Sequence, residues 1–323
     1  MANDNIHSEP GPEGSTPEQT DAALGRRDLL KASVGTLAAF ATMAGVMEPL
    51  RSMKDAPSVE QFFQEHYTRL TPEMMEAVLK RIEGEIARDY GAEVDVKDYK
   101  STSGVEFAYA LNLSRCDGSR RCVYACMREN NVPLDHPEMA YIRVLEMNID
   151  SLDLEEGDVL YETNPVPKEG RFYMPIQCHQ CRKPACTKAC PVQATWTEPD
   201  GVTVIDYNWC IGCRYCMAAC PYEARRFNWK KPAMPAEEIN PTMSYLGNRI
   251  RPRGVVEKCH FCMQRTRQGK NPACVEVCPT GSRVFGNILD PDGKIQFILK
   301  NKRVYVLKAE AKTLPRFYYY FDI

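Results

Sequence analysis

The residues with the clearest capacity for chemistry in this sequence are its 15 cysteines. They fall into four groups along the chain: Cys116, Cys122, Cys126; Cys178, Cys181, Cys186, Cys190; Cys210, Cys213, Cys216, Cys220; and Cys259, Cys262, Cys274, Cys278. An odd total cannot close completely into internal disulfides, so a purely disulfide-bonded scaffold is disfavoured. Thiolates at such short spacings are instead typical ligands of zinc or of iron–sulfur clusters.

The spacing within the third group favours iron–sulfur clusters over zinc. It reads C-x2-C-x2-C-x3-C-P, in which three cysteines hold one [4Fe–4S] cluster and the fourth reaches a different cluster. A structural zinc site needs two C-x2-C pairs and has no use for a later cysteine followed by proline. The second, third and fourth groups all end in x3-Cys-Pro. Zinc and disulfides remain the alternatives, and metal analysis separates them.

The first group is an altered copy of the third. Aligning the two matches Cys116 with Cys210, Gly118 with Gly212, Ser119 with Cys213, Arg120 with Arg214, Cys122 with Cys216, Ala125 with Ala219, and Cys126 with Cys220. Ser119 therefore stands where the repeat has a cysteine. The odd cysteine count is explained by one substituted ligand in a scheme of four equivalent groups.

Helical elements are expected ahead of the cysteines. Thr71 and Pro72 have the residue types of an N-cap and a first helical position. Apolar residues then recur at spacings of three and four as far as Tyr90, and Gly91 ends the pattern. We predict an amphipathic helix here, with a shorter helix over Val59–Arg69 before it.

The pattern changes to short β-like runs beyond residue 104. These runs are Val105–Leu113, Tyr141–Met147, Arg171–Ile176, Val202–Tyr207 and Ile295–Leu299. Asp200-Gly201 and Asp292-Gly293 provide hairpin turn signals beside two of them. We therefore expect small ββ units between the cysteine groups.

Composition and motifs exclude several classes of function. The net charge of −2 argues against a nucleic-acid-binding protein, which usually carries a basic excess. No apolar run is long enough to cross a bilayer. No dinucleotide-binding glycine motif, P-loop or nucleophile elbow occurs.

The N-terminal residues resemble an export signal. Arg26 and Arg27 precede two leucines and Lys31, and the weakly apolar stretch Ala32–Val46 follows, as in twin-arginine signals. The alternative is a surface arginine pair before a buried alanine-rich helix. That route carries folded proteins with cofactors already inserted, which agrees with a preassembled metal cofactor. We expect export to the periplasmic face of the cytoplasmic membrane, with the segment either cleaved or kept as a helical tether.

The four groups together resemble a known family. Their order, and the segments Cys259–Arg265 and Pro272–Gly281, are similar to the four-cluster ferredoxin-like electron-transfer subunits of the dimethyl sulfoxide, polysulfide and tetrathionate reductase group. The export signal and the long N-terminal lead look most like those of subunits paired with a quinone-reactive membrane protein, as in sulfite-reduction-associated and quinone–cytochrome reductase complexes. The resemblance covers about residues 104–310.

This resemblance implies the fold class and the domain organisation. The implied fold is α+β, made of tandem bacterial-ferredoxin-like ββ modules with short helices and long insertions, plus an N-terminal helical extension. The implied divisions are a signal or anchor at 1–50, a helical extension at 51–103, the four-cluster domain at 104–310 and a C-terminal tail at 311–323. The aromatic tail is either a docking strand or an edge folded back on the core.

The family's ligand scheme, carried over residue by residue, implies four sites. Site 1 takes Cys116, Cys122 and Cys278; site 2 takes Cys126, Cys259, Cys262 and Cys274; site 3 takes Cys178, Cys181, Cys186 and Cys220; site 4 takes Cys190, Cys210, Cys213 and Cys216. Sites 2 to 4 are expected to hold [4Fe–4S] clusters. Site 1 has three thiolates with Ser119 at the missing position, which suits a [3Fe–4S] cluster. The alternatives for site 1 are a [4Fe–4S] cluster with serine oxygen or water on its fourth iron, or no cluster.

The implied function is the relay of single electrons without a catalytic site of its own. The expected partners are a quinone-reactive integral membrane subunit, through which the chain associates with the membrane, and a second redox subunit of molybdopterin or cytochrome type. The alternatives are a self-contained iron–sulfur reductase and a zinc-binding structural module.

Several residues near the cysteines have two interpretations. His179 and His260 either tune or replace a ligand, or act as loop spacers. Three arginines, Arg120, Arg121 and Arg214, either offset thiolate charge or are solvated. Two tryptophans, Trp196 and Trp209, either relay electrons or pack.

Overall fold

The computed structural model describes residues 71–151, 153–159 and 165–322. The expected export signal and the expected helix over Val59–Arg69 lie outside these residues. Within the described ranges, no helix combines the length and the apolar character needed to cross a membrane.

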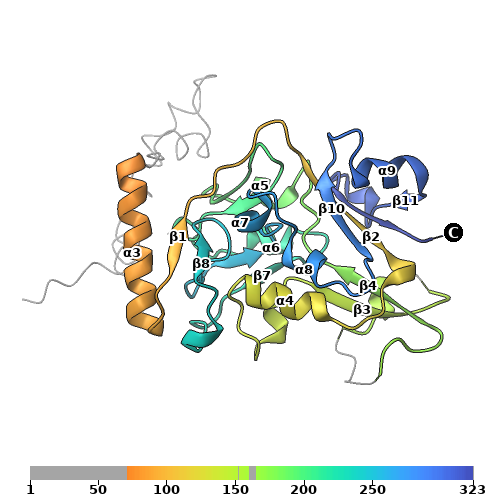
Figure 1. The fold of residues 1–323 in the computed structure, drawn as a ribbon, viewed down its shortest axis with the longest axis horizontal. Helices are drawn as coiled ribbons and strands as arrows, with labels where there is room; N and C mark the ends of the chain where they lie inside the picture. Colours follow the sequence, from red (N-terminus) through yellow and green to blue (C-terminus); the bar gives the residue numbers. More distant parts are fainter. Residues whose placement is uncertain (1–70, 152, 160–164, 323) are drawn as a thin grey trace, which may run out of the picture. The chain divides into compact units, whose positions relative to one another are not determined.

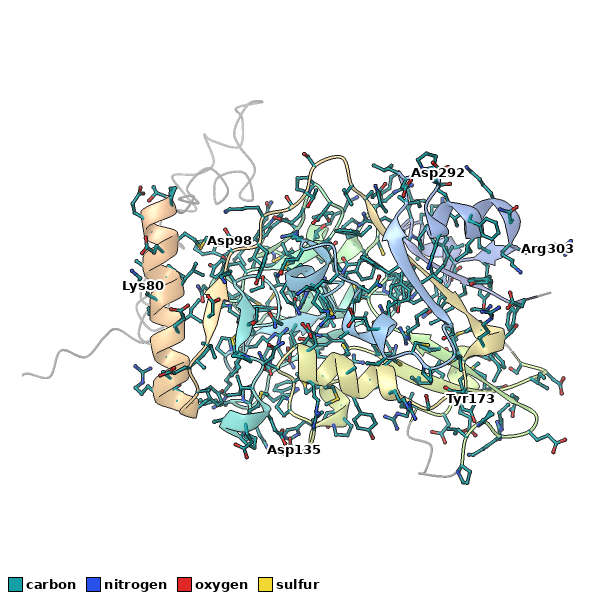
Figure 2. All side chains as sticks on the ribbon, in the orientation of Figure 1. Lys80, Asp98, Asp135, Tyr173, Asp292 and Arg303 are labelled. Carbon is teal, nitrogen blue, oxygen red and sulfur yellow. The ribbon has the colours of Figure 1, made fainter. Side chains whose placement is uncertain are left out.

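Helix α3 (Pro72–Tyr90) confirms the predicted amphipathic helix (Figure 1). The Thr71 side chain accepts a hydrogen bond from the Met74 amide, and Gly91 ends the helix with φ of 68°. Ile82 and Ile86 are buried against the core, while Lys80, labelled in Figure 2, is exposed. The spacing of apolar residues therefore gave both the element and the face that it buries.

The segment after α3 fastens this helix to the rest of the fold. Strand β1 (Asp95–Lys97) pairs in parallel with β8 (Thr242–Ser244). Within this segment the Val96 amide donates to the Glu83 carboxylate at 2.9 Å. The Tyr90 hydroxyl donates to the Pro232 carbonyl at 3.1 Å. The β1–β8 pairing and the Tyr90 contact tie residues 71–97 to Pro232 and to β8, more than a hundred residues later in the chain.

A four-stranded sheet is the largest β element of the described residues, with the strand order β10–β2–β12–β11. Strands β10, β2 and β11 are labelled in Figure 1. Its strands are β2 (Phe107–Asn112), β10 (Arg283–Asn287), β11 (Val304–Tyr305) and β12 (Phe317–Tyr320). Every residue of β2 is buried. Phe107, Tyr109 and Leu111 face the main core, while Ala108 and Ala110 face a helix that packs on the other side of the sheet. Strand β12 pairs in parallel with β2, so the aromatic C-terminal segment is folded back into the sheet.

The prediction of a strand over Ile295–Leu299 is wrong, because these residues lie in helix α9 (Lys294–Asn301). Ile295 and Ile298 are buried against Ala108 and Ala110 of β2. That spacing of three residues places both isoleucines on one helical face, and a short apolar run does not distinguish a strand from such a helix. The expected hairpin turn at Asp292-Gly293 is also wrong, because Gly293 is the N-cap residue of α9.

The remaining strands form two-stranded antiparallel pairs, and short helices lie between them. The pairs are β3 (Arg143–Asn148) with β4 (Arg171–Ile176), β5 (Thr195–Thr197) with β6 (Thr203–Ile205), and β7 (Arg225–Phe227) with β9 (Val256–Lys258). The helices are α4 (Arg121–Glu129), α5 (Ala185–Lys188), α6 (Tyr215–Ala218), α7 (Met263–Thr266) and α8 (Ala273–Glu276). The β5–β6 hairpin turns at Asp200-Gly201, as predicted. The predicted runs beginning at Val105, Tyr141, Arg171 and Val202 are confirmed as β2, β3, β4 and β6.

Candidate iron–sulfur sites

The second, third and fourth cysteine groups share one local arrangement. A loop carrying cysteines leads into a short helix, the last cysteine of the group is followed by proline and a turn, and a strand then begins. Strands β5, β7 and β10 each start at the fifth residue after that cysteine, at Thr195, Arg225 and Arg283. Proline cannot continue the helix, so the Cys-Pro step ends each helix and turns the chain into the strand.

The repeat between the first and third groups is confirmed in the backbone. Gly118 and Gly212 have φ of 73° and 72°, and Arg120 and Arg214 have φ of 58° and 64°. Both arginines are the N-cap residues of the following helices, α4 and α6. Ser119, which lies between the matched positions, therefore occupies the backbone position that Cys213 occupies in the third group.

The structure brings the predicted ligand sets together. Site 1 surrounds a cavity lined by Cys116, Cys122, Cys278 and Ser119. The site 3 cysteines line a second cavity, and the site 4 cysteines line a third. At site 2 all four cysteines are buried, and the charges of the other three raise the pKa of Cys126 in addition to the effect of burial. All 15 cysteines are free of disulfides.

These cysteines surround a space rather than a point. Among the residues that the structure describes, no three His, Cys, Asp or Glu side chains gather in a way that holds a single metal ion. Groups of thiols around a cavity fit the donor set of an iron–sulfur cluster, which is held by thiolates at its corners.

Electrostatic coupling between thiols links neighbouring sites. Besides burial and its own site's cysteines, Cys122 of site 1 raises the pKa of Cys126 in site 2. Burial first and then Cys178 of site 3 raise the pKa of Cys259 in site 2 to about 12. Cys186 of site 3 contributes in the same direction to Cys216 of site 4, again after burial. The order of neighbours is thus site 1, site 2, site 3 and site 4.

Burial makes most of these cysteines poor thiolates on their own. It raises the pKa of Cys116 to about 11 and that of Cys181 to about 12. Cys278 is different: burial opposes ionisation there too, but hydrogen bonds with Ser282 and Thr280 leave its pKa below the usual value. Since iron binds the thiolate, binding at the buried sites must release protons.

Two buried arginines that the sequence analysis missed lie directly against the cysteines. Arg225 donates to the Cys186 sulfur at 2.9 Å, and Arg283 donates to the Cys122 sulfur at 3.2 Å. Within the described residues, the Arg225 Nε and Nη1 atoms are buried without a hydrogen-bond partner, and this side chain lines the site 3 cavity. Unsatisfied donors facing a ring of thiols fit a sulfide-rich anionic group. The signal in the sequence was Cys-Pro-x3-Arg, which occurs after Cys220 and Cys278.

The two histidines in the cysteine loops are buried and neutral. His179 stacks between Tyr222 and Phe317, with ring centroids at 3.9 and 5.0 Å, and burial lowers its pKa to about 3. Burial also lowers the pKa of His260, whose Nδ1 accepts a hydrogen bond from the Met263 amide. These contacts favour packing and loop support over replacement of a thiolate.

The arginines and tryptophans named from the sequence divide between the two interpretations. Arg120 and Arg214 line the cavities of sites 1 and 4, whereas Arg121 is exposed. The Trp196 indole donates to Glu198 at 2.7 Å, and the Trp209 indole donates to the Val192 carbonyl at 2.6 Å. Both tryptophans thus have structural roles.

Comparison with known proteins agrees with these sites. Residues 170–239 and 245–288 match the 4Fe-4S dicluster domain family. The chain is 35% identical over 240 residues to the menaquinone reductase iron-sulfur cluster-binding subunit of Nitratidesulfovibrio vulgaris, covering 67% of this chain and 88% of that protein. It is 39% identical over 210 residues to the Hdr-like menaquinol oxidoreductase iron-sulfur subunit 1 of Archaeoglobus fulgidus, covering 61% of this chain and 71% of that one. One polypeptide of the anaerobic dimethyl sulfoxide reductase of Escherichia coli is 33% identical over 183 residues, covering 57% of this chain and 74% of that polypeptide.

This chain belongs to the iron–sulfur subunits of the dimethyl sulfoxide reductase group. As a member of that group it is an electron-transfer subunit of a membrane-associated reductase complex, with a ferredoxin-like 4Fe-4S domain of mixed helix and strand content. The interpretations as a self-contained reductase or as a zinc module are not favoured.

Proposed function

We propose that this iron–sulfur subunit carries single electrons along four clusters, one at each of sites 1 to 4. The observation that carries the proposal is that each site neighbours the next. Cys122 and Cys126 lie on one helix, Cys178 is coupled to Cys259, and Cys186 and Cys216 pack in one cluster. When bound, iron–sulfur clusters accept and release one electron at a time. The chain contributes the spacing, the burial and the hydrogen bonds to sulfur that set each potential.

The proposal includes tandem ferredoxin-like modules with a helical extension before them. One module combines the first and fourth cysteine groups and forms sites 1 and 2. The other combines the second and third groups and forms sites 3 and 4. In each module the cysteine that precedes proline lies with cysteines of the other group. Cys278 of the fourth group lines site 1 with first-group cysteines, and Cys220 of the third group lines site 3 with second-group cysteines, which supports this arrangement.

At site 1 we propose a [3Fe–4S] cluster. Three cysteine thiols and the Ser119 hydroxyl line this cavity, and Ser119 lies at the position that provides a thiol in site 4. A three-iron cluster needs three thiolates, so the absence of a fourth cysteine is compatible with stable binding. Sites 2 to 4 then hold [4Fe–4S] clusters.

The proposed partners are a quinone-reactive integral membrane subunit and a second redox subunit, of molybdopterin or cytochrome type. Two of the relatives are subunits of a menaquinone reductase and a menaquinol oxidoreductase, which supports a quinone-linked complex here. Mild detergent purification of the native protein tests this. A multi-span subunit with a quinone site should copurify, and its repeated absence from active preparations would contradict the proposal.

We further propose that the mature protein works on the periplasmic face of the cytoplasmic membrane, after twin-arginine export. Arg26 and Arg27 are the basis of this proposal. Replacing both by lysine should retain the protein in the cytoplasm with its clusters assembled. The matched control is Arg81→Lys on the exposed face of α3, which should leave export unchanged. Normal export of the double variant would contradict the route.

A further inference from the structure

We propose that Arg225 and Arg283 are positioning residues, each shared between two neighbouring sites, and that each sets the reduction potentials of both. Arg283 serves sites 1 and 2, and Arg225 serves sites 3 and 4. The inference rests on the proposed function, since it requires clusters at these sites.

Arg283 contacts sulfur atoms of site 1 and site 2 by different routes. Its Nη2 donates to the Cys122 sulfur of site 1 at 3.2 Å. Its Nη1 donates to the Tyr109 hydroxyl at 3.0 Å, and that hydroxyl lies 3.5 Å from the Cys274 sulfur of site 2. Because a guanidinium cannot accept, the tyrosine oxygen must be the acceptor in the first contact. The tyrosine proton is therefore left to point at Cys274.

A second branch from Arg283 also reaches site 2. Nη1 donates to the Gln177 side-chain oxygen at 3.0 Å, and the amide nitrogen of Gln177 lies 3.9 Å from the Cys259 sulfur. Arg283 is 4% exposed, so solvent screens its charge little. One buried cation thus faces site 1 directly and site 2 through two neutral side chains.

Arg225 repeats this arrangement in the other pair of sites. Its Nη2 donates to the Cys186 sulfur of site 3 at 2.9 Å and to the Thr195 hydroxyl at 3.1 Å. Cys186 packs in the same cluster as the buried Cys216 of site 4, and helix α6, which carries Cys216, packs against β7, which carries Arg225. The guanidinium therefore lies beside cysteines of both sites. Arg225 is 3% exposed.

The two arginines occupy equivalent positions in the chain. Each is the fifth residue after a Cys-Pro cysteine and the first residue of a strand, β7 for Arg225 and β10 for Arg283. In the second group the equivalent position is Thr195, which accepts a hydrogen bond from Arg225. The repeat therefore provides one cation to each pair of sites rather than one to each site.

A buried positive charge acts strongly on a nearby cluster. Reduction adds a negative charge, and the attraction between that charge and the guanidinium is little screened in the interior. Hydrogen bonds to sulfur and net charge are among the factors that set cluster potentials. Each arginine should therefore raise the potentials of both clusters that it faces.

The test is a redox titration of the cluster-loaded, full-length protein, followed by EPR. Arg283→Gln should lower the midpoint potentials of two of the four centres and leave the other two unchanged. Arg225→Gln should lower the complementary two. Arg283→Lys and Arg225→Lys keep the positive charge. Each should shift the potentials of the same two centres as the corresponding glutamine variant, but by less. The lysine variant replaces the glutamine variant in the test if the latter loses a cluster.

Arg249→Gln is the matched control. Arg249 is as buried as Arg225, its hydrogen bonds go to the Tyr245 carbonyl and the Asn208 side-chain oxygen, and the charged groups that act on it include no cysteine. It should move no potential appreciably. The shared role would be overturned if Arg283→Gln and Arg225→Gln left all four potentials unchanged. It would also be overturned if either variant shifted the potential of one centre only, or of all four. Fewer than four centres in the unsubstituted protein would instead contradict the proposed function.

Discussion

The Ser119 hydroxyl donates a hydrogen bond to the Asp117 carboxylate at 2.8 Å, and the Ser119 amide donates to the same oxygen at 3.0 Å. The residue that replaces a cysteine of the repeat is therefore held by its own loop. Its proton is directed to Asp117, so the side chain remains a neutral alcohol, which is a weaker iron ligand than a thiolate. This geometry separates site 1 from the other three.

Ser119→Cys should convert site 1 into a four-thiolate site. The backbone there already matches that of Cys213, so a thiol at position 119 is placed as in site 4. The iron content should rise by about one per chain. The EPR signal of an oxidised three-iron cluster should disappear from the air-oxidised protein.

The reciprocal variant Cys213→Ser provides the control for this conversion. It should create a three-iron signal in addition to the one from site 1. If the unsubstituted protein shows no three-iron signal and Ser119→Cys changes nothing, the assignment of site 1 is wrong.

Gly118→Ala should destabilise site 1 through a clash. A Cβ at residue 118 would lie 2.5 Å from the ring of Tyr173 on β4, a residue labelled in Figure 2. Gly104→Ala is a close control, since both glycines have φ of 73° but no atom lies within 4 Å of the Cβ position at 104. Left-handed strain costs each variant about 1–2 kcal/mol, and overpacking adds about 1–3 kcal/mol for Gly118→Ala alone. Urea unfolding and iron content measure both effects, and equal losses in the two variants would exclude the clash.

Glu257→Gln should strongly destabilise the core. Glu257 is 3.0 Å from the buried Arg251 and accepts hydrogen bonds from Tyr141 at 2.6 Å and Asn228 at 2.9 Å. Removing its charge leaves the Arg251 charge buried without a counterion, which costs about 3–5 kcal/mol. Anaerobic urea unfolding followed by circular dichroism measures the change. Glu76→Gln, at an exposed pair with Lys80 on α3, should give no measurable loss, and equal behaviour of the two variants would contradict the argument.

Ser282→Ala should change one potential only. The Ser282 hydroxyl lies 3.2 Å from the Cys278 sulfur of site 1 and is buried. Losing this hydrogen bond should lower the midpoint potential of the site 1 centre while sites 2 to 4 keep theirs. Redox titration with EPR reads this directly. A shift in two centres would mean that Ser282, like Arg283, acts beyond its own site.

The sequence predicted the parts of the site that depend on local spacing. The cysteine groups, the repeat that places Ser119, and the helix beginning at Pro72 all follow from patterns within a few turns of chain. Such patterns indicate the local backbone conformation. Cysteine spacing indicates it especially well, because a loop that holds one cluster must direct several thiols to the same place.

Features that depend on distant contacts were not predicted. The run beginning at Ile295 became a helix because β2 offers Ala108 and Ala110 as a packing surface. The pairing of β12 with β2 joins segments about two hundred residues apart. Arg225 and Arg283 were missed for the same reason, since their importance comes from cysteines of other groups, Cys186 and Cys122.

The central claim, that this subunit holds a four-cluster electron relay, is tested most directly by one measurement. Iron, zinc and acid-labile sulfide should be determined on the native, anaerobically purified protein, with EPR spin quantification of the same sample. We predict about 15 iron and about 16 sulfide per chain, no stoichiometric zinc, and one three-iron signal on oxidation. An iron content near eight, as for a two-cluster protein, or zinc in place of iron would contradict it.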